Sequence, residues 1–268
     1  VSGGTTKNAV NIAGMRVSYG TASNSGTAAK IKVDHGYGIV GTDNTVISNE
    51  GKIEVTGKYV GNTSGGVSTK RTNNGFSAET DKPAGENYGI VGVSRYDTVS
   101  YEDSYVINNK TIITNAVDIT NKGGKIIVEG TRATGIYAAN VNADQSNVNI
   151  SYDNSASSSN QDLIRVNSET TGNADNKGVY GVGIALVNKG ATSKTGGTIT
   201  LNTKGDALSS SVTPDIRTAY NGFGIYGESA DIVFASASKG VTIESKDNGA
   251  GIWITDDSHI SSTTDRSG

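Results

Sequence analysis

A short Gly-Ile step that recurs six times along this chain restricts its fold more than any other feature. In each copy two residues precede Gly-Ile, and the isoleucines of the six copies are Ile39, Ile90, Ile136, Ile184, Ile225 and Ile252. Short alternating strands bounded by Gly and Asn turns lie between them, among them Lys52–Val55, Lys125–Val128 and Thr198–Leu201. A repeat of this kind indicates stacked equivalent units and not one wide globular core.

The six steps fall 51, 46, 48, 41 and 27 residues apart, and the strands between them roughly halve several of these intervals. A coil of about 20 to 25 residues is the perimeter of a parallel β-solenoid, whose rungs stack at about 4.8 Å. The spacing therefore predicts an all-β parallel β-helix of about ten coils, about 45 to 50 Å long. The six isoleucines are expected to stack in one column.

Two other folds built from repeats or short strands fit less well. A β-sandwich gives no reason to repeat a Gly-Ile step, whereas a solenoid needs Gly at each tight corner, where a positive φ or a close backbone approach recurs in every coil. Helical heptads are absent, which argues against a coiled-coil stalk.

Composition agrees with a thin core and excludes several functions. Only 34% of the residues are hydrophobic, which suffices when each strand buries one Ile, Val or Leu. The absence of Cys excludes thiol catalysis, disulfides and thiolate metal sites. Lys and Arg number 23 against 26 Asp and Glu, so the chain lacks the basic surplus that binding to nucleic acid requires.

Four stretches break the coil pattern and are expected to be loop insertions in a single β-helix covering 1–268. They are 57–86, 93–106, 140–178 and 203–221. Part of the third stretch, Val148–Ser151, alternates like one more strand. Because coils repeat nearly the same small and polar side chains, recognition is expected on the insertions.

The 93–106 segment holds the densest group of aromatic and acidic residues, and it is the candidate ligand-binding site. The group consists of Tyr96, Asp97, Tyr101, Glu102, Asp103 and Tyr105. Aromatic faces beside carboxylates suit sugars or a cationic side chain. The alternative is that Tyr96 and Tyr105 are strand residues that cover the edge of a coil.

The most enzyme-like cluster is Asp256-Asp257-Ser258-His259, which follows Trp253 closely. Paired carboxylates serve as acid and base in β-helical polysaccharide hydrolases, but adjacent strand residues point to opposite faces and cannot converge on one bond. A polar turn after the strand 251–254 is therefore expected there, without catalysis. The segment Asn173–Gly178 lacks the oxygen ligands of a calcium loop, and no metal or cofactor is expected.

The Gly36-Tyr37-Gly38-Ile39 and Asn49-Glu50-Gly51-Lys52-Ile53-Glu54-Val55 patterns, with no Cys and few aromatics, resemble the passenger domains of bacterial autotransporters, especially the large outer-membrane adhesins. The resemblance implies a right-handed parallel β-helix on the bacterial cell surface, secreted through a C-terminal outer-membrane β-barrel. That barrel would be the only link to the membrane, and the end of the chain, Asp265–Gly268, is not one of its strands. Since the chain opens on Val1, it is expected to be a fragment of a longer passenger.

The resemblance thus implies a non-enzymatic, extracellular adhesin module that binds a protein or glycan on host or bacterial cells. The Gly-Asp-Ser-Gly motif of the serine-protease autotransporters is absent. Two alternatives stay open: a structural β-helix spacer without a ligand, and a β-helical carbohydrate-active enzyme or phage tailspike.

Overall fold

The described part of the chain consists of β-strands and connecting turns. The computed structural model describes residues 13–34, 36–56, 87–94, 116–129, 133–140, 148–154, 163–167, 181–188, 197–202, 214–218, 222–235, 241–245 and 249–262. Within these residues the regular elements are twenty strands, with no helix among them.

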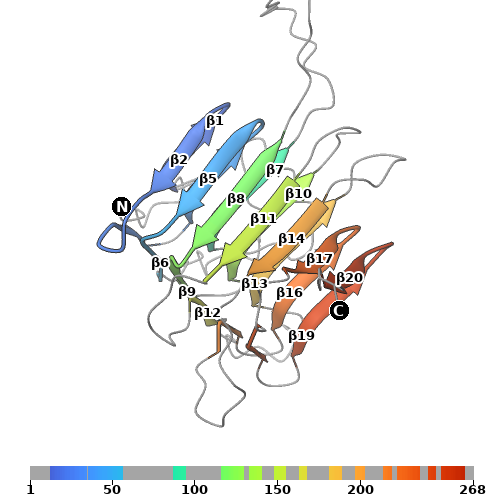
Figure 1. Ribbon diagram of the computed structural model, residues 1–268. Coiled ribbons are helices and arrows are strands. Elements are labelled where there is room, and N and C mark those ends of the chain that lie inside the picture. Colours follow the sequence, from blue (N-terminus) through green and yellow to red (C-terminus); the bar gives the residue numbers. More distant parts are fainter. Residues whose placement is uncertain are drawn as a thin grey trace, which may run out of the picture.

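The strands form three parallel sheets, which the chain visits in turn (Figure 1). Sheet A contains β1 (Ala13–Ser18), β4 (Tyr37–Thr42), β7 (Tyr88–Ser94), β10 (Thr134–Asn140), β13 (Val182–Asn188), β16 (Phe223–Glu228) and β19 (Ala250–Thr255). Sheet B contains β2 (Thr21–Asn24), β5 (Thr45–Asn49), β8 (Val117–Lys122), β11 (Val148–Asp153), β14 (Gly197–Asn202), β17 (Asp231–Phe234) and β20 (His259–Ser262). Sheet C contains β3 (Lys30–Val33), β6 (Lys52–Val55), β9 (Lys125–Glu129), β12 (Ile164–Asn167), β15 (Ile216–Thr218) and β18 (Ile243–Ser245). One strand from each sheet makes one coil, so the predicted parallel β-helix is confirmed.

The predicted number of coils is wrong. Sheets A and B have seven strands each in the described residues, which corresponds to seven rungs and a stack of about 30 Å. Successive Gly-Ile steps lie on neighbouring rungs, so each interval between steps is a full coil. The strands that seemed to halve those intervals are the sheet B and sheet C sides of the same coil. The first described coil has no long insertion, and it takes 24 residues, from Met15 to its register partner Ile39.

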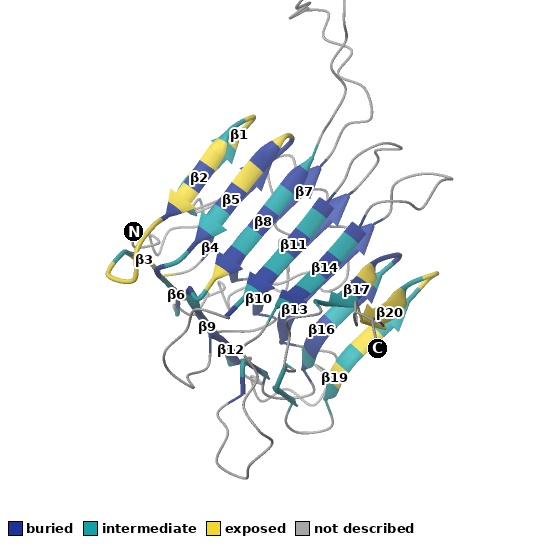
Figure 2. Ribbon diagram, viewed as in Figure 1, coloured by how far each residue is buried: buried dark blue, intermediate teal, exposed yellow. Residues whose placement is uncertain are grey.

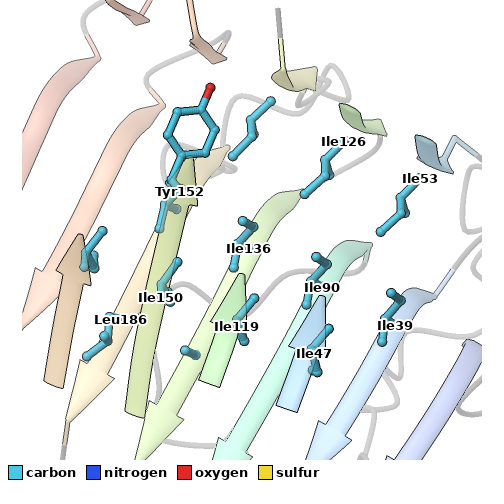
Figure 3. Close-up of a cluster of buried hydrophobic side chains, with 14 of the residues drawn as sticks. Ile39, Ile47, Ile53, Ile90, Ile119, Ile126, Ile136, Ile150, Tyr152 and Leu186 are labelled. Carbon is cyan, nitrogen blue, oxygen red and sulfur yellow. The ribbon is translucent and has the colours of Figure 1, made fainter. Parts of the chain in front are cut away.

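The predicted isoleucine column is confirmed. Ile39, Ile90, Ile136, Ile184, Ile225 and Ile252 are register partners on consecutive strands of sheet A. Sheet B and sheet C add their own columns, which include Ile47, Ile119 and Ile150 in one and Ile53 and Ile126 in the other (Figure 3). The core is therefore a narrow line of stacked side chains, each of which stabilises the fold by about 1.5 to 3 kcal/mol when fully buried.

The recurrent glycines lie within the strands of sheet A, not at corners. A Cβ on Gly135 would lie 2.5 Å from the carbonyl oxygen of Gly183 and 2.6 Å from Cγ2 of Ile164. Gly38, Gly89, Gly183 and Gly224 meet the same two obstacles, an isoleucine of sheet C and the next glycine carbonyl. The sequence suggested two reasons for a recurrent Gly, a positive φ or a close backbone approach. For the Gly of the Gly-Ile step, the close backbone approach applies.

Positive φ values at residues other than Gly occur elsewhere, in the turns that lead from sheet A to sheet B. These residues are Tyr19, Asp43, Asn44, Ser229, Asp256 and Asp257, and the glycines with positive φ are Gly26, Gly36 and Gly123 at the other corners. Most of the residues other than Gly are Asp, Asn or Ser, short polar residues of which Asp and Asn adopt the left-handed region more readily than other non-Gly residues do.

Two of the four stretches expected to be loop insertions contain strands. The stretch 140–178 contains β11 and β12, and 203–221 contains β15, so neither is a single loop. The strand expected at Val148–Ser151 is confirmed as β11, whose inward residues Val148, Ile150 and Tyr152 alternate with polar ones. Val93 and Ser94 end β7. The rest of 93–106, and all of 57–86, lie outside the described residues.

Candidate binding surface

The structure does not test the site predicted from the sequence. Tyr96, Asp97, Tyr101, Glu102, Asp103 and Tyr105 all lie outside the described residues. Their role in binding stays a prediction, and the accessible surface described below consists of other residues.

The outward side of sheet A carries a second apolar cluster. Gly and Ile of each step both face the core side, so the residue before the step and the residue after it share the outward face. Tyr37, Val40, Tyr88, Val91 and Tyr137 belong to this cluster. The rings of Tyr37 and Tyr88 stack with centroids 5.4 Å apart, and Tyr88 meets Tyr137 edge-on at 5.8 Å.

This outward face is closed in the middle of the stack. Every residue of β4, β7, β10 and β13 is buried, so these strands are covered on both sides, whereas the strands of sheet B alternate between buried and more accessible positions (Figure 2). The three stacked tyrosines therefore stabilise the sheet and present little surface to a ligand.

The same face opens at the last two rungs, where Phe223, Tyr226 and Trp253 form what we call the aromatic patch. The Phe223 ring lies 6.1 Å from the Tyr226 ring and 5.4 Å from the Trp253 ring, tilted against both. Trp253, the only Trp of the chain, is 49% exposed. The register partner of Phe223 is the small residue Ala250. An apolar ring surface is thus accessible at this position.

Carboxylates lie beside the aromatic patch. The Tyr226 hydroxyl donates a hydrogen bond to Oε2 of Glu228 at 3.0 Å. Asp256 and Asp257 are exposed in the turn that directly follows β19. Burial raises the pKa of Tyr226, and the charges of Glu228 and Asp256 raise it further, against a hydrogen bond with Thr255 that lowers it. The patch thus combines π faces with hydrogen-bond acceptors.

Residues 222–235 and 249–262 include Glu228, Asp231, Asp256 and Asp257, and contain neither Lys nor Arg. Glu228 lies on β16, and Asp256 and Asp257 lie in the turn after β19, whereas Asp231 lies on sheet B and pairs with His259. In these two ranges the sheet A side of the last rungs therefore carries carboxylates and no basic side chain. Such a surface favours ligands that are neutral or positively charged.

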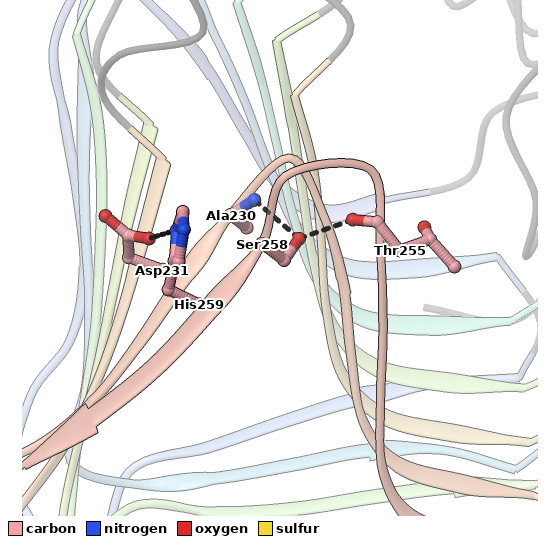
Figure 4. Close-up of polar contacts among 5 residues, drawn as sticks. All are labelled: Ala230, Asp231, Thr255, Ser258 and His259. Atoms are coloured by element: carbon pink, nitrogen blue, oxygen red, sulfur yellow. Dashed lines mark hydrogen bonds and ion pairs between the residues drawn. The ribbon is translucent and has the colours of Figure 1, made fainter.

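The cluster Asp256–His259 forms the expected polar turn (Figure 4). Ser258 Oγ accepts a hydrogen bond from the Ala230 amide at 3.0 Å and donates one to the Thr255 carbonyl at 2.6 Å. His259 Nδ1 lies 3.2 Å from Oδ1 of Asp231, its register partner on the preceding rung. These contacts attach the last turn to the one below it.

Sequence reasoning missed Tyr226 and Trp253 as surface residues. The signal was present, because an aromatic residue directly follows the isoleucine of the step at Tyr137, Tyr226 and Trp253. That position faces outward on every rung. The sequence does not show that the first of these three is buried and the last exposed.

The described residues contain no group of three or more His, Asp or Glu placed to hold a metal ion. The described part of the chain also has no helix long and apolar enough to cross a membrane.

The chain was also compared with known proteins. No protein-family model, no curated protein and no solved structure matches it.

Proposed function

We propose that this chain is an extracellular, non-enzymatic adhesin module from the passenger of a bacterial autotransporter. It attaches the bacterial surface to host or microbial cells by binding a protein or glycan on them. The observation that supports this most is the half-exposed Trp253 beside Phe223 and Tyr226, an accessible ring surface on a sheet whose middle strands are closed. Exposed aromatic side chains of this kind dominate the energetics of many binding surfaces.

A rigid stack suits an adhesin because it displays its outward faces beyond the cell surface. One patch of three rings makes a weak contact by itself. Many copies on one cell raise the effective concentration of the second and later contacts, and modest affinities then suffice for attachment.

The test is attachment of beads coated with the chain to candidate host and bacterial cells. Trp253→Ala should reduce attachment strongly, because it removes the exposed ring without disturbing a buried column. The matched control is Val46→Ala, which truncates an apolar residue of sheet B that is exposed to a similar degree. Circular dichroism should show the same fold in both variants.

A parallel variant tests the site predicted from the sequence. Tyr96, Tyr101 and Tyr105 are replaced together by Ser. Loss of attachment in this variant, with Trp253→Ala unaffected, would move the site to the 93–106 segment. Attachment that is unchanged in both variants would contradict both sites, and no attachment of the intact chain to any cell would contradict adhesion.

A structural spacer is the second candidate, and one observation favours it. The outward face of sheet B stacks Ser23, Ser48, Thr120, Ser151 and Thr200 in one column, so successive rungs present nearly the same small hydroxyl side chains. Such a face offers little specificity. A spacer predicts no attachment by the isolated chain.

The enzyme alternative has a separate test. The Ser258 hydroxyl is bound to two backbone groups, which supports a structural role for the turn. Turnover of acidic polysaccharides by the chain, lost on Asp257→Asn, would overturn the non-enzymatic proposal.

A further inference from the structure

The aromatic patch offers an incoming ligand π faces and hydrogen-bond acceptors. The Tyr226 hydroxyl already donates to Glu228, and the other described side chains that act on it are the Thr255 hydroxyl and the Asp256 carboxylate. Carboxylates only accept hydrogen bonds at neutral pH. A sugar hydroxyl both donates and accepts, so a sugar would use only half of its capacity here. A ligand with several donors and no acceptor is the better complement.

Charge leads to the same class of ligand. Glu228 and Asp256 lie beside Tyr226, residues 222–235 and 249–262 contain no Lys or Arg, and aromatic rings attract cations through their faces. Trp is the strongest of these aromatic partners. Within the described residues the outward side of sheet A carries one Arg, Arg16, and it lies on the first rung, at the opposite end of the stack.

We propose that the aromatic patch, with Glu228 and Asp256 beside it, binds the guanidinium group of an arginine side chain displayed by a protein on the target cell. This inference rests on the proposed function and names the partner of the same site. Guanidinium is planar, has five N–H donors and no acceptor, stacks on aromatic rings and is weakly hydrated. It can lie on the Trp253 ring and donate to Glu228 or Asp256 at the same time. A lysine ammonium is strongly hydrated and lacks the flat face, so it fits less well.

The single Trp of the chain makes the inference directly measurable. The intact chain is titrated with an amidated peptide in which three Arg alternate with Gly, and Trp253 fluorescence is followed. Three matched probes replace Arg with its neutral isostere citrulline, replace Arg with Lys, or replace the peptide with a neutral glucose tetrasaccharide. We expect a saturable change with the Arg peptide that weakens as salt is raised, and affinity at least about tenfold lower for the citrulline peptide and the tetrasaccharide.

Charge-removing variants locate the site. Glu228→Gln keeps an acceptor for Tyr226, and Asp256→Asn keeps a residue that tolerates its positive φ of 47°. Each should weaken the Arg peptide several-fold. Asp118→Asn removes a carboxylate from the face of sheet B and should leave binding unchanged. Trp253→Phe removes the fluorophore, and its affinity is measured by calorimetry.

The outcomes separate this inference from the adhesion proposal. The inference is overturned if the Arg peptide does not bind, if the citrulline peptide or the tetrasaccharide binds equally well, or if Glu228→Gln and Asp256→Asn have no effect. Cell attachment that requires Trp253 but is not competed by the Arg peptide would also overturn it, while adhesion would stand. Peptide binding without any Trp253-dependent cell attachment would contradict the adhesion proposal and leave the guanidinium site in place.

Discussion

At the scale of single residues, the Gly of each Gly-Ile step is required by its neighbours in space. Gly135 has the Gly183 carbonyl and the Ile164 methyl group where a Cβ would stand. Gly251, the equivalent residue on the last rung, has no atom closer than 4.0 Å to that position. The same residue type in the same column is thus under strong constraint on one rung and under almost none on another.

Gly135→Ala should therefore destabilise the fold, by about 1 to 3 kcal/mol as is usual for overpacking, and Gly251→Ala should leave stability within about 0.5 kcal/mol. Urea denaturation of both variants measures the difference. Equal midpoints for the two variants would show that close approach does not explain the repeat.

Glu54 is a second residue whose surroundings matter. Its carboxylate accepts a hydrogen bond from Lys30 Nζ at 2.8 Å and pairs with Lys52 as well, and only 15% of its side chain is exposed. Hydrogen bonds from the two lysines, first Lys30 and then Lys52, lower the pKa of Glu54 from 4.5 to about 2. The folded state therefore prefers ionised Glu54 more than the unfolded chain does.

A group with a lowered folded-state pKa stabilises the fold above its unfolded pKa and loses that contribution as pH falls toward the folded pKa. Glu54→Gln should reduce stability by about 1 kcal/mol at neutral pH, since partly exposed ion pairs are weak. The gap between wild type and variant should shrink between pH 4.5 and about 2. Denaturation at several pH values tests this, and a gap that stays constant across that window would contradict it.

At the scale of elements, buried side-chain ladders align the ends of the sheet B strands. Asn24 Nδ2 donates to Asn49 Oδ1 at 2.8 Å, Asn49 Nδ2 to Asn121 Oδ1 at 2.7 Å, and Asn121 Nδ2 to the Gly124 carbonyl at 2.8 Å. All three side chains are buried. The ladder stops at the next rung, where the register partner of Asn121 is Tyr152.

Asn49→Ala should be costly, because it leaves the Asn24 amide and the Asn121 oxygen buried without these partners. Each such orphan costs about 1 to 3 kcal/mol, so a loss of about 2 to 4 kcal/mol is expected. Asn149→Ala is the control, since its bond to Asp118 lies on the partly accessible face of sheet B, and it should cost about 1 kcal/mol or less. Thermal unfolding compares the two, and similar losses would contradict a special role for the ladder.

At the scale of the whole molecule, stability should vary along the stack. The strands β7, β10 and β13 are buried throughout, whereas β20 is exposed at every residue and Ile260 is 50% exposed. Each rung contacts only its neighbours, so a stack of this type opens from its ends.

Hydrogen exchange followed by peptide-resolved mass spectrometry should therefore show fast exchange in β19 and β20 and the slowest exchange in β10 and β13. The expected difference is at least about tenfold in rate, equivalent to about 1.4 kcal/mol in opening free energy. Uniform protection along the stack would show that the β-helix opens as one unit.

Much of this architecture could be predicted from the sequence. The isoleucine column follows from the repeat alone, because a strand alternates its faces with period two, and a one-residue slip would turn every Ile of a strand away from the core. The polar turn at Asp256–His259 follows from its composition. The strands β12 and β15 were harder to recognise, since they have only four and three residues and lie within polar stretches.

The solenoid, its inward column and its thin core could be read from the residues alone, because these depend on patterns within a few residues. The number of coils, the need for Gly at position 135 and the place where the outward aromatic face opens became clear only in the folded chain. Each of these depends on residues many positions away, such as Ile164 and Gly183 around Gly135. Tyr137 and Trp253 occupy equivalent places in the repeat, and only their positions in the stack make one buried and the other accessible.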